Sequence, residues 1–118
     1  MKTLVLGASL NSNRYSNRAV KLLLECKHVV VAIGKDEGNI DDVKIEKDFS
    51  AADKIDTVTV YLSKEHQRLY YEKIIAAKPR RIIFNPGAEN FELKKLANEN
   101  GIETEDACTL VLLNTGQY

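Results

Sequence analysis

The sequence predicts an α/β protein in which helices cover both faces of a mostly parallel sheet. Short apolar runs alternate with amphipathic stretches along the whole chain. The run Val29–Ile33 is unbroken and rich in β-branched residues, which is typical of a strand buried on both faces. Strand–helix alternation with short connections requires right-handed crossovers onto a parallel sheet. Because no linker, repeat or low-complexity segment interrupts the 118 residues, we expect a single domain over residues 1–118.

Periodicity and end signals place the individual elements. Apolar residues recur every three or four positions in the predicted helices and are continuous in the predicted strands. Ser63 is a suitable N-cap, Pro79 ends the helix that Ser63 begins, and Asn100-Gly101 is a suitable C-cap pair. The predicted strands are 3–6, 29–33, 57–62, 81–84 and 102–105, with a short extended piece at 43–45. The predicted helices are about 15–27, 64–78 and one from 92. The apolar tail at 107–113 is a short helix or a further extended segment.

About five strands with helices on both faces predict a three-layer, doubly wound, Rossmann-like sheet of order 3-2-1-4-5. Ligands bind such sheets outside the carboxyl ends of the strands, at the point where the strand order reverses. In this predicted order, that point lies between the first strand and the strand 81–84. We therefore expect the loops at Gly7 and at Asn85-Pro86-Gly87 to face each other across one crevice.

The composition excludes several classes of protein. Hydrophobic residues make up 44% of the chain and charged residues 29%, an ordinary globular balance. The 17 Lys and Arg residues equal the 17 Asp and Glu residues, whereas nucleic-acid or anionic-membrane binders normally have a basic excess. The longest apolar stretches are too short to span a bilayer. We expect no nucleic-acid partner and no membrane partner.

The cysteines and histidines show no framework or metal pattern. Cys26 and Cys108 are too few for a disulfide framework. His28 and His66 stand far apart without metal-ligand spacing, and we expect a strand edge for the first and a helix surface for the second. The N-terminus does not have the pattern of a signal peptide. By elimination, we expect a cytoplasmic protein without a metal site.

The loop after the first strand has the composition of a phosphate-binding loop. A strand that ends in Gly, followed by small and polar residues and a helix, offers backbone N–H groups to a phosphate. Arg14 adds a permanently charged guanidinium group, and Ser9 and Ser16 add hydroxyl donors. The dinucleotide pattern Gly-x-Gly-x-x-Gly and the Walker A pattern are both absent. An ordinary turn with a solvated Arg14 is the alternative. The candidate ligand-binding residues here are Gly7, Ala8, Ser9, Arg14, Tyr15 and Ser16.

Gly34 and Lys35 stand where NAD-binding proteins place an acidic residue that holds a ribose hydroxyl. A carboxylate would repel a phosphorylated ribose, whereas an ammonium group attracts one. Lys35 therefore favours a ligand with an extra ribose phosphate, such as coenzyme A (CoA) or NADP. A surface lysine balanced by Asp36 and Glu37 is the alternative.

The remaining candidates are Asn85-Pro86-Gly87 and Cys108. All three residues of the first segment favour turns, and at the crevice Asn85 would also aim its amide at a ligand. Cys108 precedes the apolar tail, where a small buried thiol is commoner than a reactive one. The predicted ligand loops carry no Ser/His/Asp order, carboxylate pair or metal cluster. This absence favours ligand binding over catalysis.

Together, these motifs resemble the family of small stand-alone CoA-binding domains over nearly the whole chain. The resemblance rests on Val5–Ser9, Arg14–Ser16, Ile33–Lys35, Asp56–Val60, Phe84–Gly87 with Glu89–Asn90, and Ala107–Val111. It implies a Rossmann-like fold similar to the CoA-binding domain of succinyl-CoA synthetase α-chains. The roles that it implies are phosphate binding by Gly7, Ser9, Arg14 and Ser16, a place near the adenosine end for Lys35, and lining of the cleft by Asn85–Gly87.

The sequence thus predicts a non-catalytic protein that binds CoA or acyl-CoA as a sensor or carrier, with no protein partner identified. An NADP-dependent or acyl-CoA-handling enzyme with Cys108 as a thiol is the alternative. A signalling receiver domain is a second alternative, but it requires an acidic pocket after the first strand, where Gly7-Ala8-Ser9 provides none.

Overall fold

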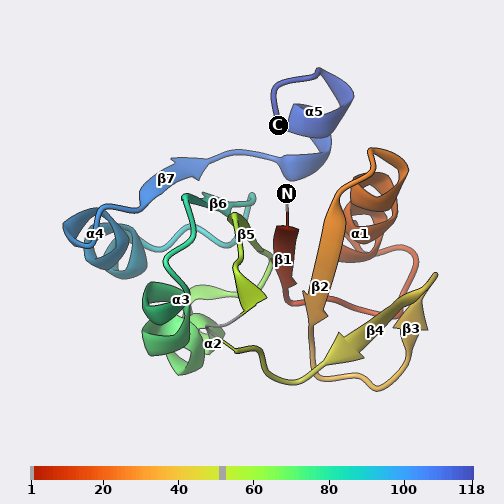
Figure 1. Ribbon diagram of the computed structural model, residues 1–118, viewed down its shortest axis with the longest axis horizontal. Coiled ribbons are helices and arrows are strands. Elements are labelled where there is room, and N and C mark those ends of the chain that lie inside the picture. Colours follow the sequence, from red (N-terminus) through yellow and green to blue (C-terminus); the bar gives the residue numbers. More distant parts are fainter. Residues whose placement is uncertain (1, 51–52) are drawn as a thin grey trace.

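The computed structural model describes residues 2–50 and 53–118, in which a seven-stranded sheet lies between two layers of helices (Figure 1). The strands are β1 (Lys2–Leu6), β2 (Val29–Ile33), β3 (Asn39–Ile40), β4 (Val43–Glu46), β5 (Thr57–Val60), β6 (Arg81–Phe84) and β7 (Glu103–Asp106). The helices are α1 (Tyr15–Glu25), α2 (Lys64–Gln67), the 3₁₀ helix η2 (Arg68–Tyr70), α3 (Tyr71–Ala77), α4 (Phe91–Glu99) and α5 (Thr109–Asn114).

The sheet has the order β3-β4-β2-β1-β5-β6-β7, and its strands are parallel except for the β3–β4 hairpin. The Rossmann-like α/β class predicted from the sequence is confirmed, but the predicted strand order is wrong. The segment predicted to lie beyond β2 is β5, and β5 pairs instead with β1, with Thr57 opposite Thr3. The strand beyond β2 is β4, with Ile45 opposite Ala32.

The error arises from β4, which the sequence showed only as a short extended piece. Its four residues Val-Lys-Ile-Glu alternate apolar and polar, and only Ile45 is fully buried. Counted as a strand, β4 takes the third place and moves every later strand one place along. The order of the parallel strands is then 3-2-1-4-5-6, which reverses between β1 and β5.

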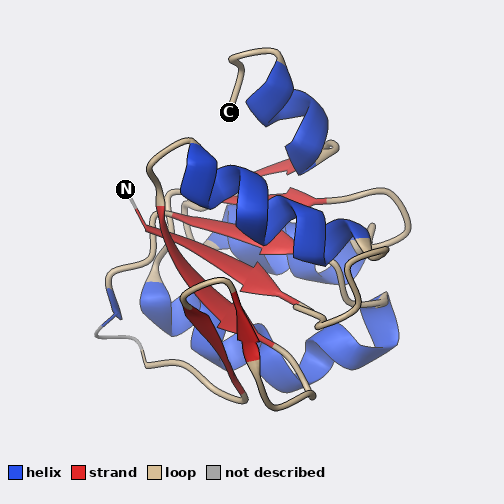
Figure 2. Cartoon of the chain, turned by 90° about the vertical axis from the view of Figure 1, so that its right-hand side faces the viewer, coloured by secondary structure: helices blue, strands red, loops and turns tan. Residues whose placement is uncertain are grey.

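Helices cover both faces of the sheet (Figure 2). Alternating side chains of the strands build a core on each face. Leu4 and Leu6 of β1 pack in the larger core with residues of α3 and α4, such as Ile74 and Leu93. Val5 faces the other way and packs with residues of α1. The apolar tail of the sequence forms α5 beside α1. Of the two alternatives left open for the tail, a short helix and an extended segment, the helix is the one that forms.

The predicted helix 64–78 is divided into α2, η2 and α3. Gln67 at the end of α2 is fully buried, and its Nε2 donates hydrogen bonds to the backbone oxygens of Leu62 (2.9 Å) and Ala88 (2.8 Å). Its Oε1 accepts a hydrogen bond from Asn90 Nδ2. This buried amide ties α2 to the loops that follow β5 and β6, and the chain then tightens into the 3₁₀ turn.

Across residues 2–50 and 53–118, no helix has the length and apolar character needed to cross a membrane. Within the same ranges, no three His, Cys, Asp or Glu side chains come together as a group that holds a metal ion.

Candidate functional site: a cleft at the carboxyl ends of the strands

A cleft of about 840 Å³ lies beyond the carboxyl ends of the parallel strands, within the roughly 300–1,000 Å³ typical of small-molecule sites. It is lined by Gly7, Ala8, Ser9, Asn13, Arg14, Tyr15, Ser16, Ile33, Gly34, Lys35, Asp36, Lys47, Tyr61, Leu62, Ser63, His66, Leu69, Tyr70 and Pro86. The structure therefore brings together every candidate residue named from the sequence except Asn85, Gly87 and Cys108.

Asn85 and Gly87 are not among the lining residues, although Pro86 between them is. The Asn85 side chain is buried, where its Nδ2 donates to Thr59 Oγ1 (2.7 Å) and its Oδ1 accepts from the Thr109 backbone N–H (2.8 Å). Gly87 donates its backbone N–H to the Glu89 carboxylate (2.9 Å). Asn85 thus links β5, β6 and α5. Because the sheet reverses between β1 and β5, the segment after β5 faces Gly7.

Close backbone contacts fix the first part of the loop between β1 and α1. Gly7 has a φ of +101°, and a Cβ atom there would lie 3.0 Å from the backbone nitrogen of Leu62. The N–H groups of Gly7 and Ala8 both donate to the Ile33 carbonyl oxygen at 2.8 Å. A Cβ atom on Gly34 would lie 2.2 Å from the Ala8 carbonyl oxygen. These contacts seat the loop between the ends of β2 and β5.

The free N–H groups of this loop lie at the start of α1 rather than at Gly7. The first backbone N–H groups of a helix have no partner within the helix and need a capping acceptor. Arg14 occupies the N-cap position of this eleven-residue helix, and it makes no side-chain cap. An arginine side chain carries only donors. The first turn, with Tyr15 and Ser16 in the cleft wall, is therefore open to an anion.

Three cationic side chains surround that end of the cleft. Arg14, Lys35 and Lys47 are all exposed and line the cleft. In the part of the chain that the structure describes, the ion pairs involve other Lys and Arg residues, so no carboxylate neutralises these three. Asp36 is the acidic residue of the lining. Lys47 was missed from the sequence because β4, which it directly follows, was recognised only as a short extended piece and not as a strand of the sheet.

The opposite wall, built by the ends of β5 and β6 and by α2 and η2, is more apolar. Leu62, Leu69, Tyr70 and Pro86 belong to it, and we call these four residues the apolar wall. Ser63 and His66 add polar atoms, with 2.7 Å between Ser63 Oγ and His66 Nδ1. His66 was expected on a helix surface, and Leu69 and Tyr70 were not predicted for the site, because the sequence did not show which face of the predicted helix 64–78 meets the cleft.

Tyr61 forms part of the floor between the two walls. Burial raises the pKa of its hydroxyl to about 12, although the hydroxyls of Thr109 and Thr59 lower it by lying close. The Tyr61 hydroxyl is buried and makes no well-aligned hydrogen bond in the described residues. The phenol therefore stays protonated at neutral pH.

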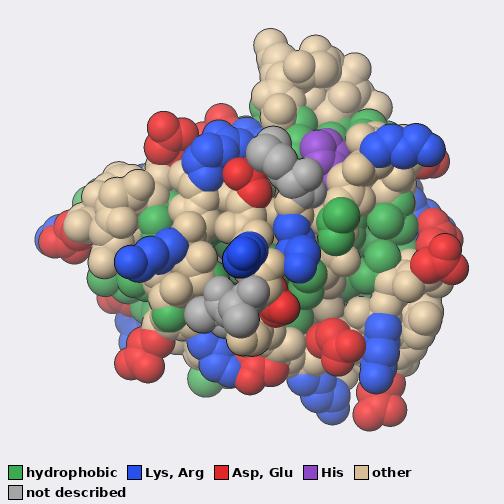
Figure 3. Space-filling view, viewed as in Figure 1, with side chains coloured by type: hydrophobic (Ala, Val, Ile, Leu, Met, Phe, Trp, Pro, Cys, Tyr) green, Lys and Arg blue, Asp and Glu red, His purple; other side chains and the backbone are tan. Residues whose placement is uncertain are grey.

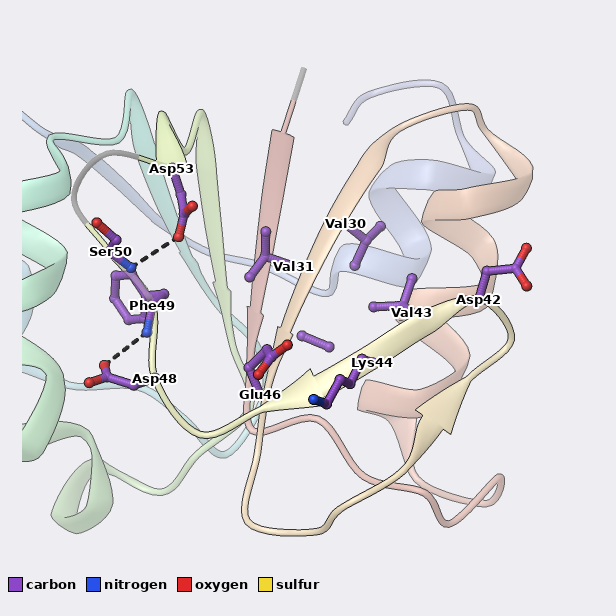
Figure 4. Close-up of a pocket in the computed structure, with 11 residues that line it drawn as sticks. Val30, Val31, Asp42, Val43, Lys44, Glu46, Asp48, Phe49, Ser50 and Asp53 are labelled. Carbon is purple, nitrogen blue, oxygen red and sulfur yellow. Dashed lines mark hydrogen bonds between the residues drawn. The ribbon is translucent and has the colours of Figure 1, made fainter.

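A second, more open groove of about 580 Å³ lies on the face of the molecule beside β2 and β4 (Figure 4). Figure 3 shows hydrophobic side chains beside β2 on this face, with charged side chains around them. Val30, Val31 and Val43 line the groove together with the carboxylates of Glu46 and Asp48. Its acidic rim makes it unsuitable for a polyphosphate, in contrast to the cleft.

An open, mostly parallel sheet that reverses its order beside such a cleft defines a Rossmann-like α/β protein. Residues 1–114 match the family described as CoA binding domain. The chain belongs to this CoA-binding domain family. No match was found among curated proteins.

Solved structures share the fold of this chain. A crystal structure described as that of an uncharacterized protein is 39% identical, with a TM-score of 0.95 over 99% of this chain and 97% of that one. Two more distant structures, each 19% identical and matching over 99% of this chain, share the fold. One is a protein of Thermus thermophilus described as cell-free ID.343, with a TM-score of 0.85 over 90% of that chain. The other is Prb, described as the PH1109 protein redesigned for binding, with a TM-score of 0.86 over 84% of that chain.

Proposed function

We propose that this protein binds CoA, or a thioester of CoA, in the cleft at the carboxyl ends of β1, β2 and β5. The observation that carries the proposal is the uncapped start of α1, where Arg14 replaces the usual acceptor, beside the unpaired cations Lys35 and Lys47. Free N–H groups and unpaired cations together favour a polyphosphate. In this proposal, the pyrophosphate lies at the first turn of α1.

The uneven lining of the cleft supports CoA over NAD. In Rossmann folds the end of the second strand receives the ribose of the adenosine. Here Lys35 follows that strand, and Lys47 follows the neighbouring β4. Two cations suit the ribose 3′-phosphate of CoA, whereas NAD has no phosphate there. The rest of CoA is a mostly uncharged arm, which suits the less charged β5 side of the cleft.

We further propose that the protein acts as a carrier or sensor and not as an enzyme of Cys108 chemistry. Cys108 is half buried at the N-cap of α5 and does not line the cleft. Because Cys108 is not among the lining residues, the cleft gives no support to the alternative enzyme with Cys108 as its thiol.

Native mass spectrometry of the purified protein, followed by calorimetry with CoA, 3′-dephospho-CoA, NADP and NAD, tests the proposal. We expect CoA to bind most tightly. We expect the loss of the 3′-phosphate to weaken binding between about fivefold and 150-fold, since a charged hydrogen bond contributes roughly 1–3 kcal/mol when partly exposed.

The variants Lys35→Ala and Lys47→Ala test whether these two lysines cause the difference in affinity between CoA and 3′-dephospho-CoA. Each should bring the affinity for CoA closer to that for 3′-dephospho-CoA. Lys21→Ala, on the exposed side of α1, is the matched control and should keep the full difference. NAD binding more tightly than CoA would contradict the proposal, and NADP binding more tightly would assign the site to NADP instead.

A further inference from the structure

One side chain of the cleft is far more exposed than its chemistry favours. Leu69 in η2 is 82% exposed and lines the cleft. It stands beside Tyr70, and the other members of the apolar wall, Leu62 and Pro86, come from the ends of β5 and β6. Single exposed leucines are common on protein surfaces. A leucine that shares a concave wall with three other apolar residues instead marks a surface for an apolar ligand group.

The apolar wall lies on the side of the cleft where the thiol end of CoA would lie, so this inference rests on the proposed function. With the adenosine over β2 and β4 and the pyrophosphate at α1, the arm of CoA extends toward β5. That arm contains two amide groups, and Ser63 and His66 offer polar atoms to them. The thiol at its tip is small and leaves the apolar wall uncovered.

We propose that the ligand is an acyl thioester of CoA and that its saturated acyl chain lies on the apolar wall. The chain then covers Leu69, which is otherwise exposed to water. Burial of a methylene group yields about 0.8 kcal/mol, which corresponds to roughly a fourfold gain in affinity. A chain that lies on an open wall is covered on one side, so we expect roughly a twofold gain for each added methylene group.

A chain-length series tests this inference. Calorimetry measures the affinities of the protein for CoA and for its acetyl, butanoyl, hexanoyl and octanoyl thioesters. We expect affinity to rise with chain length from butanoyl onward. In Leu69→Ser, the rise should become flat; each thioester is compared with CoA in the same variant, so a change in the affinity for CoA itself does not enter the comparison. Because Leu69 is so exposed, this variant should fold as the wild type does.

Phe91→Ser is the matched control, since Phe91 is 80% exposed but does not line the cleft. It should keep the rise with chain length. A flat series in the wild type, with CoA still bound, would refute the acyl site and leave the proposed function intact. A rise that persists in Leu69→Ser would also refute it. Failure of CoA and all four thioesters to bind would instead refute the proposed function.

Discussion

Gly34 is the residue whose replacement should disturb the cleft most directly. In Gly34→Ala the new Cβ atom would lie 2.2 Å from the Ala8 carbonyl oxygen, more than 1 Å closer than an ordinary contact. The φ of Gly34 is not in the left-handed region, so the clash alone causes the effect. The β1–α1 loop has to move, and this weakens the hydrogen bonds from the N–H groups of Gly7 and Ala8 to Ile33.

The two hydrogen bonds contribute about 1 kcal/mol each, and the crowding costs roughly 1–3 kcal/mol, so we expect a loss of about 3–5 kcal/mol in the free energy of unfolding if both bonds are lost. For a domain of this size, that lowers Tm by roughly 10–20 °C. Urea and thermal unfolding followed by circular dichroism measure both values.

Gly87→Ala separates a clash from backbone strain. Gly87 has a φ of +92°, and no atom lies within 4 Å of the position of its Cβ. This variant should lose about 1 kcal/mol through its backbone conformation alone. The proposed role of the Gly34–Ala8 contact would be wrong if Gly34→Ala were as stable as the wild type or no less stable than Gly87→Ala.

Three further predictions concern Arg14, Asp56 and Cys108. Arg14→Ala should weaken CoA binding roughly 3- to 30-fold without a change in Tm. Arg18→Ala, outside the cleft lining, is the control and should bind CoA as the wild type does. Equal affinities of the Arg14 variant and the wild type in calorimetry would show that Arg14 does not contact the ligand. Burial acts to raise the pKa of Asp56, but hydrogen bonds from Arg80 and Thr57 outweigh it and hold that pKa below the usual 3.8. The carboxylate therefore stabilises the fold above about pH 4 and loses this effect as the pH falls through the lowered pKa. Asp56→Asn should lower the free energy of unfolding by about 1 kcal/mol at neutral pH and by progressively less in acid. Urea unfolding in which the difference between wild type and variant stays constant down to the acid range would contradict this. Incubation with CoA disulfide should modify the exposed Cys26 before the half-buried Cys108, so intact mass should show an adduct that survives Cys108→Ser; an adduct lost only in that variant would place the CoA thiol near Cys108.

Part of the site could be predicted because its signals are local. The Gly7 loop and Gly34-Lys35 directly follow strands that are recognisable by their unbroken apolar runs, and Arg14 directly precedes a helix with helical apolar spacing. The positions of these loop residues are fixed by the strand that ends before them and the helix or strand that begins after them. The carboxyl ends of parallel strands meet at one edge of the sheet, so residues just after β1 and β2 come together whatever the remaining order is.

Asn85 shows why other residues could not be placed in the same way. Its neighbours in the sheet depend on whether the weak segment 43–46 counts as a strand, which four alternating residues do not decide. Once β4 pairs with β2, β5 occupies the place beside β1, and Asn85 moves one strand away from the reversal point. Its amide is then satisfied by Thr59 and Thr109, far apart from it in sequence.

The sequence by itself determined the Rossmann-like α/β class and the phosphate-type loop, because hydrophobic periodicity and turn residues act over short distances. Only the tertiary structure decided the strand order and, apart from Pro86, the apolar wall of the cleft. His66 and Leu69 reach that wall because the buried Gln67 bonds to Leu62 and Ala88, and the helix predicted there gives way to a 3₁₀ turn. A hydrogen bond across 21 residues has no local signature, so no periodicity in the sequence predicts it.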